Sequence, residues 1–181
     1  LIGAQPTSFA YPVIDERSAA AMCYTSGTTG DPKGVVYSHR SIWLHSMQVN
    51  SSSGMALGNA DSVLAIVPMF HVMSWGLPFA AMMGGITLIM PDRFLQPEPL
   101  LQILDATKAT FAAAVPTIWA GVAAQLAVKP QDISHLREVV VGGAAVPPSM
   151  IRTFDKLGTR IVHAWGMTET SPLGSVSRPP F

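Results

Sequence analysis

Cysteine is nearly absent from this chain, because Cys23 is the only one among 181 residues. A single thiol excludes an internal disulfide, and it excludes a metal site built from clustered cysteines. Such sparing use of cysteine suits a reducing compartment, so a cytoplasmic location is expected.

Charge is also scarce: charged side chains make up 12% of the residues, and 11 basic residues are matched by 11 acidic ones. Soluble domains carry about 25% charged residues. The basic residues are scattered from Arg17 to Arg178, which excludes a nucleic-acid binder with a basic face. Because 49% of the residues are hydrophobic, the sequence also excludes a disordered chain.

No charged residue lies between Asp61 and Asp92, which raises the question of a membrane span. A transmembrane helix needs about 20 predominantly apolar residues. Here Pro68, Pro78 and the pair Gly84-Gly85 interrupt the run and would leave backbone groups unsatisfied in lipid. We predict instead a buried strand, a loop, a helix and a second buried strand, and no transmembrane segment.

Apolar runs of strand length alternate with segments of helical period along the chain. Continuous apolar runs are typical of parallel strands that are covered on both faces. The sequence therefore predicts an α/β fold with a mainly parallel sheet flanked by helices. The expected strands are Ala19 to Tyr24, Val63 to Val67, Ile86 to Met90, Thr110 to Ala114, Glu138 to Val141 and Ile161 to Ala164.

Four helices are expected to begin at residues that suit a helix N-terminus. Ser38 can cap the first, Pro97 and Pro116 open the next two, and Pro147-Pro148-Ser149 opens a last helix that ends near Gly158. In such sheets ligands bind beyond the carboxyl ends of the strands. Four loops of this kind are candidates for a site: Thr25 to Gly34, Pro68 to Trp75, Gly142 to Val146 and Trp165 to Thr170.

The loop from Thr25 to Gly34 combines hydroxyls, glycines and a lysine, Lys33. This combination binds phosphate, since glycines let backbone N–H groups approach, hydroxyls donate hydrogen bonds and lysine supplies a positive charge. It is not the Walker pattern, whose lysine follows a glycine and precedes Ser or Thr. A polar hairpin between Tyr24 and Val35 is the alternative, because Gly-Asp-Pro is favourable turn chemistry.

Four segments carry longer motifs: Tyr24 to Val35, Val67 to Val72 with Trp75, Gly142 to Ala144, and His163 to Thr170. The first, third and fourth resemble the signature loop, the nucleotide and acyl pocket segment, and the adenine and magnesium segment of the AMP-forming adenylating superfamily. That superfamily contains acyl-CoA synthetases, peptide-synthetase adenylation domains and luciferases. The second segment is similar to medium- and long-chain fatty acyl-CoA ligases in particular. The resemblance covers essentially the entire chain.

The resemblance implies a role for each matched residue. The β- and γ-phosphates of ATP would be held by Thr25, Ser26, Gly27, Thr28, Thr29, Gly30 and Lys33. Thr168 would contact the α-phosphate, Glu169 would coordinate Mg²⁺, and Trp165 would pack against adenine where most members have Tyr. The remaining nucleotide pocket would consist of Gly142, Gly143, Ala144, His163, Ala164, Gly166 and Met167.

The acid would be bound by His71, Trp75, Gly143 and Ala144. His71 would lie where the carboxylate meets ATP, although a lone histidine among apolar neighbours is more often a structural residue. Trp75 would gate an acyl tunnel, and plain core packing explains it equally well. Two interpretations, an adaptable apolar cavity and core filling, also fit a group of methionines: Met69, Met73, Met82, Met83 and Met90.

By this resemblance the chain is an internal fragment of the N-terminal adenylation domain of a fatty acid–CoA ligase, without the C-terminal lid domain. It does not begin with Met, which agrees with a fragment. The parent would use ATP, Mg²⁺ and coenzyme A, with Lys33, Thr168, Glu169 and His71 as catalytic residues, and the fragment alone would be inactive. Two alternatives stay open: a CoA ligase for an aryl, short-chain or sulfur-containing acid, and a nucleotide-binding module without catalysis. Self-association also stays open.

Overall fold

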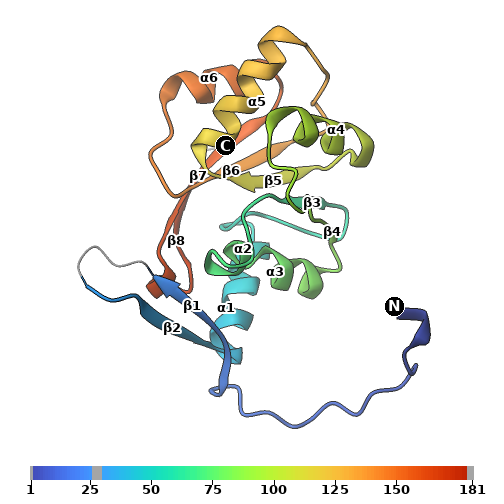
Figure 1. Cartoon of the computed structure of the whole chain (residues 1–181), viewed down its shortest axis with the longest axis vertical. Coiled ribbons are helices and arrows are strands. Elements are labelled where there is room, and N and C mark those ends of the chain that lie inside the picture. Colours follow the sequence, from blue (N-terminus) through green and yellow to red (C-terminus); the bar gives the residue numbers. More distant parts are fainter. Residues whose placement is uncertain (1, 26–29, 179–181) are drawn as a thin grey trace.

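The computed structural model describes residues 2–25 and 30–178, and Figure 1 shows their arrangement. A short 3-10 helix, η1 (Ile2–Ala4), is followed by an extended segment that runs away from the rest of the molecule. Two sheets follow, one with two strands and one with six. No helix within residues 2–25 and 30–178 is long and apolar enough to cross a membrane.

The first two strands, β1 (Ala19–Thr25) and β2 (Lys33–Ser38), form an antiparallel hairpin of their own. The strand predicted at Ala19 to Tyr24 therefore exists, but its expected place in the parallel sheet is wrong. The physical reason is that only one face of the hairpin is covered, since Met22 and Val36 on the other face are exposed. A hairpin is therefore present, as the alternative expected, whereas phosphate binding by this segment stays a prediction and residues 26–29 lie outside the described residues.

The large sheet has the strand order β4-β3-β5-β6-β7-β8. Its first five strands are parallel, and β8 pairs antiparallel with β7 at the edge. This confirms the predicted α/β fold with a mainly parallel sheet, whereas β8 was not predicted. The bounds are β3 (Ser62–Ala65), β4 (Thr87–Ile89), β5 (Phe111–Ala114), β6 (Glu138–Val141), β7 (Arg160–Gly166) and β8 (Leu173–Ser177).

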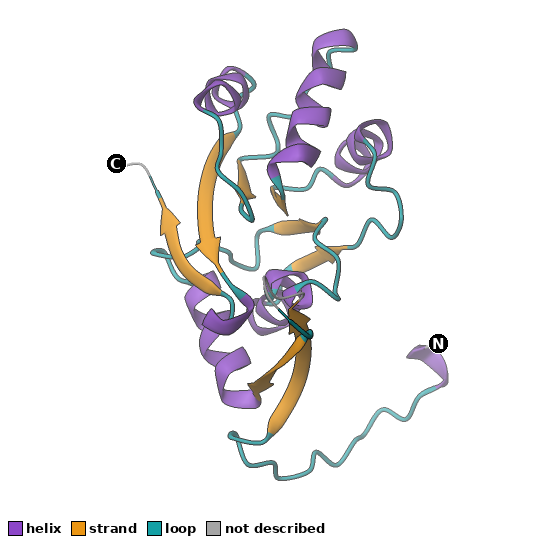
Figure 2. Ribbon diagram, turned by 60° about the vertical axis from the view of Figure 1, so that its left-hand side comes forward, coloured by secondary structure: helices purple, strands orange, loops and turns teal. Residues whose placement is uncertain are grey.

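Helices cover both faces of the large sheet, as Figures 1 and 2 show. On one face α4 (Pro97–Thr107), α5 (Pro116–Val128) and α6 (Pro148–Lys156) bury a core that includes Trp119 and Phe154. On the other face α1 (His39–Asn50) and α3 (Leu77–Gly84) pack against the alternate side chains of the same strands. Strand residues thus face two cores, which explains their continuous apolar runs.

The predicted helix starts are confirmed. Ser38 caps α1, because its Oγ accepts a hydrogen bond from the Ser41 backbone N–H at 3.1 Å. Proline occupies the first turn of α4, α5 and α6. The uncharged stretch between Asp61 and Asp92 contains β3, a loop, a helical segment and β4, in the predicted order.

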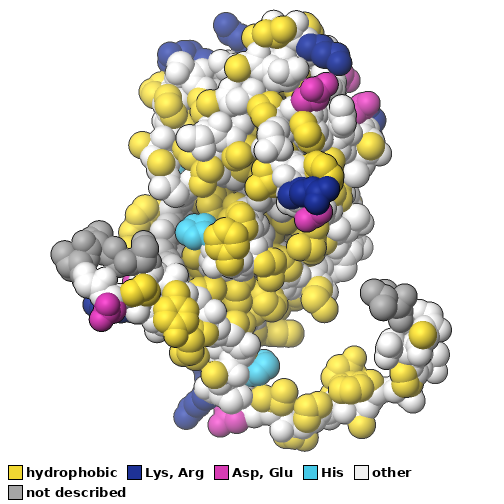
Figure 3. Space-filling model, viewed as in Figure 1, with side chains coloured by type: hydrophobic (Ala, Val, Ile, Leu, Met, Phe, Trp, Pro, Cys, Tyr) yellow, Lys and Arg dark blue, Asp and Glu magenta, His cyan; other side chains and the backbone are white. Residues whose placement is uncertain are grey.

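Apolar side chains gather on the lower part of the face drawn in Figure 3. The exposed large apolar side chains of the molecule include Trp43, Leu44 and Met47 on α1 and Met22 and Val36 on the hairpin. The low charge content of the sequence is therefore expressed at the surface as well as in the core.

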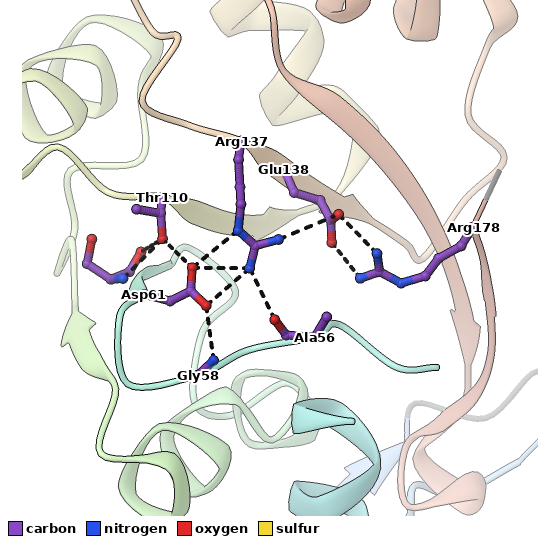
Figure 4. Close-up of polar contacts among 8 residues, drawn as sticks. Ala56, Gly58, Asp61, Thr110, Arg137, Glu138 and Arg178 are labelled. Carbon is purple, nitrogen blue, oxygen red and sulfur yellow. Dashed lines mark hydrogen bonds and ion pairs between the residues drawn. The ribbon is translucent and has the colours of Figure 1, made fainter. Parts of the chain in front are cut away.

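A network of ion pairs lies at the amino ends of the central strands (Figure 4). Glu138, the first residue of β6, is 2% exposed and pairs with Arg178 at 2.8 Å. Arg178 also donates to the Gly54 carbonyl at 2.7 Å, which ties the end of β8 to the loop after α1. Beside them Arg137 pairs with Asp61 at 3.1 Å. This network fastens the sheet at the edge opposite the loops in which a site is expected.

Candidate functional site

A cavity of about 580 Å³ lies at the carboxyl ends of β6 and β7, where the hairpin approaches the large sheet. It brings together residues from all four motif-bearing segments. The predicted site residues that line it are Thr25, Lys33, His71, Trp75, Gly142, Gly143, Ala164, Trp165, Gly166, Met167, Thr168 and Glu169. Gly30, Ala144 and His163 lie outside the lining, and Ser26, Gly27, Thr28 and Thr29 lie outside the described residues.

Five further lining residues were not predicted: His45, Met55, Val72, Pro172 and Leu173. Of these, His45 left a signal in the sequence, since it shares the apolar stripe of α1 with Ile42 and Val49. A histidine on a stripe that is otherwise apolar is a polar group that needs a buried partner.

The hairpin presents one face to the cavity. Thr25 pairs with Lys33 in the register, so their side chains share a face, and both line the cavity. Side chains two positions apart in a strand lie on the same face, so Tyr37 follows Lys33 on this side. Tyr37 is buried there, whereas Lys33 is exposed and its ammonium group is available to an anionic ligand.

Trp165 at the end of β7 offers a flat aromatic surface. One side of its ring packs on Gly174 of β8, where an added Cβ would lie 2.4 Å from a ring carbon. The residue is nevertheless 55% exposed, so part of the indole stays open to the cavity. An aromatic ring held in this way can stack on a planar base, as the predicted contact with adenine requires.

Thr168 and Glu169 belong to the short 3-10 helix η2 (Thr168–Thr170) between β7 and β8. The Thr170 hydroxyl accepts from the Met167 backbone N–H at 2.9 Å and fixes the start of this turn. The Glu169 carboxylate is exposed at the cavity, and within residues 2–25 and 30–178 no three metal-ligating side chains gather. One free carboxylate suits Mg²⁺, which is commonly held by one or two carboxylates together with phosphate oxygens and water.

The segment after β3 is an unusual left-handed turn. Val72, Met73, Ser74 and Trp75 have φ values of 44°, 50°, 56° and 53°, and Gly76 follows at 72°. This conformation costs an L-residue roughly 1–2 kcal/mol. The segment labelled α2 (Val72–Trp75) thus lies in the predicted loop Pro68 to Trp75 and is a strained turn that the surrounding structure must hold.

Two side chains hold this turn. The Ser74 hydroxyl donates to the Val67 carbonyl at 2.6 Å, and the His45 ring binds the Trp75 carbonyl through Nε2 at 3.0 Å. Gly76 is necessary for the second contact, because an added Cβ would lie 2.3 Å from the His45 ring.

The protonation of His45 follows from this contact. A carbonyl only accepts, so Nε2 carries the hydrogen, and the buried Nδ1 has no partner among the described residues. Burial lowers the pKa of His45, and the hydrogen bond to the Trp75 carbonyl offsets this only in part. His45 is therefore neutral at pH 7.

Trp75 contacts both the core and the cavity. It packs against the core between the large sheet and helices α1 and α3, and against a small apolar cluster around Cys23 and Tyr37 of the hairpin. It also lines the cavity. Both interpretations of Trp75 are thus compatible with its position. The five methionines named above do not line the cavity; Met73 is buried in the hairpin cluster, and Met82 is 84% exposed. The methionines of the lining are Met55 and Met167.

Comparison with known proteins identifies relatives of this chain. The chain is 48% identical over 172 residues to a 3-methylmercaptopropionyl-CoA ligase from Ruegeria pomeroyi, with 94% of this chain and 32% of the relative covered. It is 44% identical over 180 residues to a medium-chain-fatty-acid–CoA ligase from Ectopseudomonas oleovorans, with coverage of 99% and 33%. The chain thus spans about a third of the length of these relatives.

The fold likewise matches a solved structure, that of a long-chain-fatty-acid–CoA ligase from Archaeoglobus fulgidus. The TM-score is 0.85 at 26% identity, and the match covers 98% of this chain and 37% of that one. The model of the AMP-binding enzyme family matches residues 4–180. The family inferred from the motifs is confirmed, and this chain belongs to the AMP-binding enzymes.

Proposed function

We propose that the chain is an internal part of the N-terminal adenylation domain of an ATP-dependent fatty acid–CoA ligase. The observation that carries the proposal is the single cavity in which Lys33, Trp165, Glu169 and Trp75 meet, although they come from separate segments. A cation, an aromatic surface, a free carboxylate and an apolar wall are the groups that a nucleotide and an acyl chain require.

The first proposed half-reaction joins the acid to AMP. A carboxylate oxygen attacks the α-phosphorus of ATP, the bond to the β-phosphate oxygen breaks, and pyrophosphate leaves. Lys33 and Thr25 line the side of the cavity formed by the hairpin, so they would bind the departing phosphates. Thr168 would donate to the α-phosphate, and Trp165 would hold the base. Charge on Lys33 would count most in the transition state, as negative charge shifts toward pyrophosphate.

The second proposed half-reaction transfers the acyl group to coenzyme A. The thiol gives its proton to water, its sulfur attacks the acyl carbon, the mixed anhydride bond breaks, and AMP leaves. Glu169 would hold Mg²⁺, which would supply positive charge to the phosphates in the first half-reaction. His71 lies at the N-terminus of the left-handed turn and lines the cavity, so it would contact the carboxylate of the acid. A cytoplasmic location, which the free thiol of Cys23 favours, is part of this proposal.

Pyrophosphate exchange by the full-length protein that contains this chain tests the proposal. Acid-dependent exchange of labelled pyrophosphate into ATP is expected with fatty acids of medium or long chain. Each further methylene buried in the apolar part of the cavity contributes about 0.8 kcal/mol, so kcat/KM rises about fourfold per carbon until the cavity is full.

The alternatives predict other outcomes. Exchange with 3-methylmercaptopropionate and not with fatty acids would assign the protein to sulfur-containing acids, in line with the first relative named above. Nucleotide binding without exchange for any acid would leave a binding module. For an acid that supports exchange, coenzyme A is then added to the reaction. Formation of acyl-CoA is followed by the absorbance of the thioester.

A further inference from the structure

Tyr37 connects the hairpin to the large sheet. Its side chain is buried, and its hydroxyl donates a hydrogen bond to the main-chain carbonyl of Thr168, 131 positions further along the chain. Among the hydrogen bonds found within residues 2–25 and 30–178, this is the one that joins β1 or β2 to the six-stranded sheet or its connecting turns. The carbonyl that it binds belongs to η2, which also carries Glu169.

The other contacts found between the described part of the hairpin and this region are apolar. Cys23 and Tyr37 form a small buried cluster with Val72 and Met73 of the left-handed turn. Apolar contacts are not directional, so they hold the hairpin against the turn without fixing its angle. A hydrogen bond has a preferred length and angle. The Tyr37 hydroxyl therefore makes the directional contact found between the hairpin and η2 within the described residues.

This orientation matters for Lys33. Lys33 lies on the same strand and the same face as Tyr37, four residues earlier, which is about 13 Å along a strand. Thr25 stands opposite Lys33 in the register. A rotation of the hairpin about the Tyr37 contact would thus displace both cavity residues relative to Glu169.

The surroundings keep the hydroxyl protonated. Burial, followed by the nearby Cys23 and the negative charge of Glu169, raises the pKa of Tyr37 to about 12. The phenol is therefore a hydrogen-bond donor at neutral pH.

We infer that Tyr37 is a positioning residue for adenylation: its hydrogen bond to Thr168 sets the separation between Lys33 on the hairpin and Glu169 on η2. The inference rests on the proposed function, in which both groups serve one bound triphosphate. Because charge stabilisation of a transition state depends on groups that are already in place, a small displacement reduces the rate. Tyr37 itself touches neither the acid nor the nucleotide in this scheme.

The test uses Tyr37→Phe in the full-length protein, with Tyr11→Phe as the matched control. Tyr11 is exposed in the N-terminal segment, so the same deletion of a hydroxyl removes no buried contact there. The rate of adenylate formation in single turnovers is expected to fall about tenfold in Tyr37→Phe, as the loss of one buried hydrogen bond predicts. The KM for the acid is expected to stay within twofold, and Tyr11→Phe to match the wild type.

Two unnatural residues at position 37 separate the hydrogen bond from packing. Replacing Tyr37 with p-aminophenylalanine keeps a donor at the para position, whereas p-methylphenylalanine has the same size without a donor. The amino variant is expected to restore the rate to within threefold of wild type, and the methyl variant to behave as Tyr37→Phe. If Tyr37→Phe does not fold, this pair of variants still shows whether the rate depends on the hydrogen bond or on the packing of the side chain.

Several outcomes would overturn the inference. Wild-type rates in Tyr37→Phe, or equal rates in the two para-substituted variants, would show that the hydrogen bond does not position the site. Proportional losses of rate, acid affinity and thermal stability would assign Tyr37 a purely structural role. If the wild type forms no adenylate with any acid, the proposed function fails and the inference fails with it, which is distinguishable from both of these results.

Discussion

The two ends of the parallel strands, here called the amino edge and the carboxyl edge of the large sheet, are built in opposite ways. At the amino edge Glu138, Arg178, Arg137 and Asp61 are joined by ion pairs and hydrogen bonds. At the carboxyl edge Lys33 and Glu169 line a cavity, and neither has an ion pair within the described residues. Charges at the first edge satisfy one another, whereas those at the second are left for a ligand.

The backbone conformation also differs between the two edges. The amino edge carries its network on strand ends and on the loop after α1, in which one non-glycine residue, Ala56, has a positive φ of 50°. The carboxyl edge carries four consecutive left-handed residues, Val72 to Trp75, held by Ser74 and His45. Strain of this kind persists only where the surroundings impose it, and it collects at functional sites. Changes at the amino edge should therefore act on stability, and changes at the carboxyl edge should act on activity.

The largest expected effect is on stability, at Glu138. Replacing Glu138 with Ala leaves Arg178 largely buried and without its counter-ion, and breaking a buried pair in this way costs about 3–5 kcal/mol. Urea unfolding of the full-length protein should show this loss, whereas the adenylation rate per folded molecule should not change. Asp155→Asn is the control, because this nearby carboxylate is exposed and makes no ion pair within the described residues. Equal unfolding midpoints for the two variants would contradict the stabilising role of the network.

Lys33→Ala should show the reverse pattern, a large loss of activity with little change in stability. One lysine–phosphate pair is worth roughly 4 kcal/mol before desolvation costs, so adenylation in single turnovers should slow about 100-fold or more. Stability should change little, since Lys33 is exposed. Lys129→Ala, an exposed lysine at the end of α5, should behave as wild type. An unchanged adenylation rate in Lys33→Ala would remove this residue from the mechanism.

Gly76 allows the strain of the left-handed turn to be separated from its packing. Gly76 and Gly85 both have positive φ, at 72° and 62°, but only at Gly76 would an added Cβ meet a neighbour, the His45 ring. Gly76→Ala should therefore be less stable than Gly85→Ala by about 1–3 kcal/mol, the usual cost of overpacking. It should also reduce kcat/KM for the acid, because His45 holds the carbonyl of Trp75. Identical stabilities and kinetics for the two variants would show that His45 and Gly76 do not support the turn.

The parallel sheet could be predicted from sequence because each of its strands contains an apolar run, interrupted in β7 only by His163. Strand β8 could not, since Leu173–Ser177 contains one glycine and two serines and is held by pairing with β7. Strand β2 begins at Lys33, inside the motif that indicated a phosphate loop. Strand β8 thus exists because of its partner and not because of its own composition, whereas β2 contains the strand-forming residues Val35, Val36 and Tyr37.

The residues of the cavity also divide into those that the sequence could indicate and those that it could not. Lys33, Trp165 and Glu169 lie in motifs, and their chemistry could be recognised locally. The contact of His45 with the Trp75 carbonyl joins positions 30 residues apart, and that of Tyr37 with Thr168 joins positions 131 apart. No local pattern specifies such pairs, so only the folded structure reveals them.

The smallest expected effect returns to the amino edge, at Asp61. Burial alone would raise the pKa of its carboxyl, but hydrogen bonds from Thr110 and Gly58 and the charge of Arg137 outweigh it, so that the pKa lies below its ordinary value. A carboxyl with a depressed pKa in the folded state contributes stability above its unfolded pKa of about 3.9 and loses it as the pH falls through the folded value.

Asp61→Asn should therefore be modestly less stable than wild type at pH 7, and the difference should shrink below about pH 4, where the wild-type carboxyl also becomes neutral. Thermal unfolding of both proteins across pH 3 to 8 measures this, with Asp92→Asn as control, because Asp92 is exposed and outside the network. Adenylation at pH 7 should stay unchanged, as expected for the amino edge. A stability difference that stays constant with pH would mean that the Asp61 charge does not contribute, and that shape alone holds the network at this corner of the sheet.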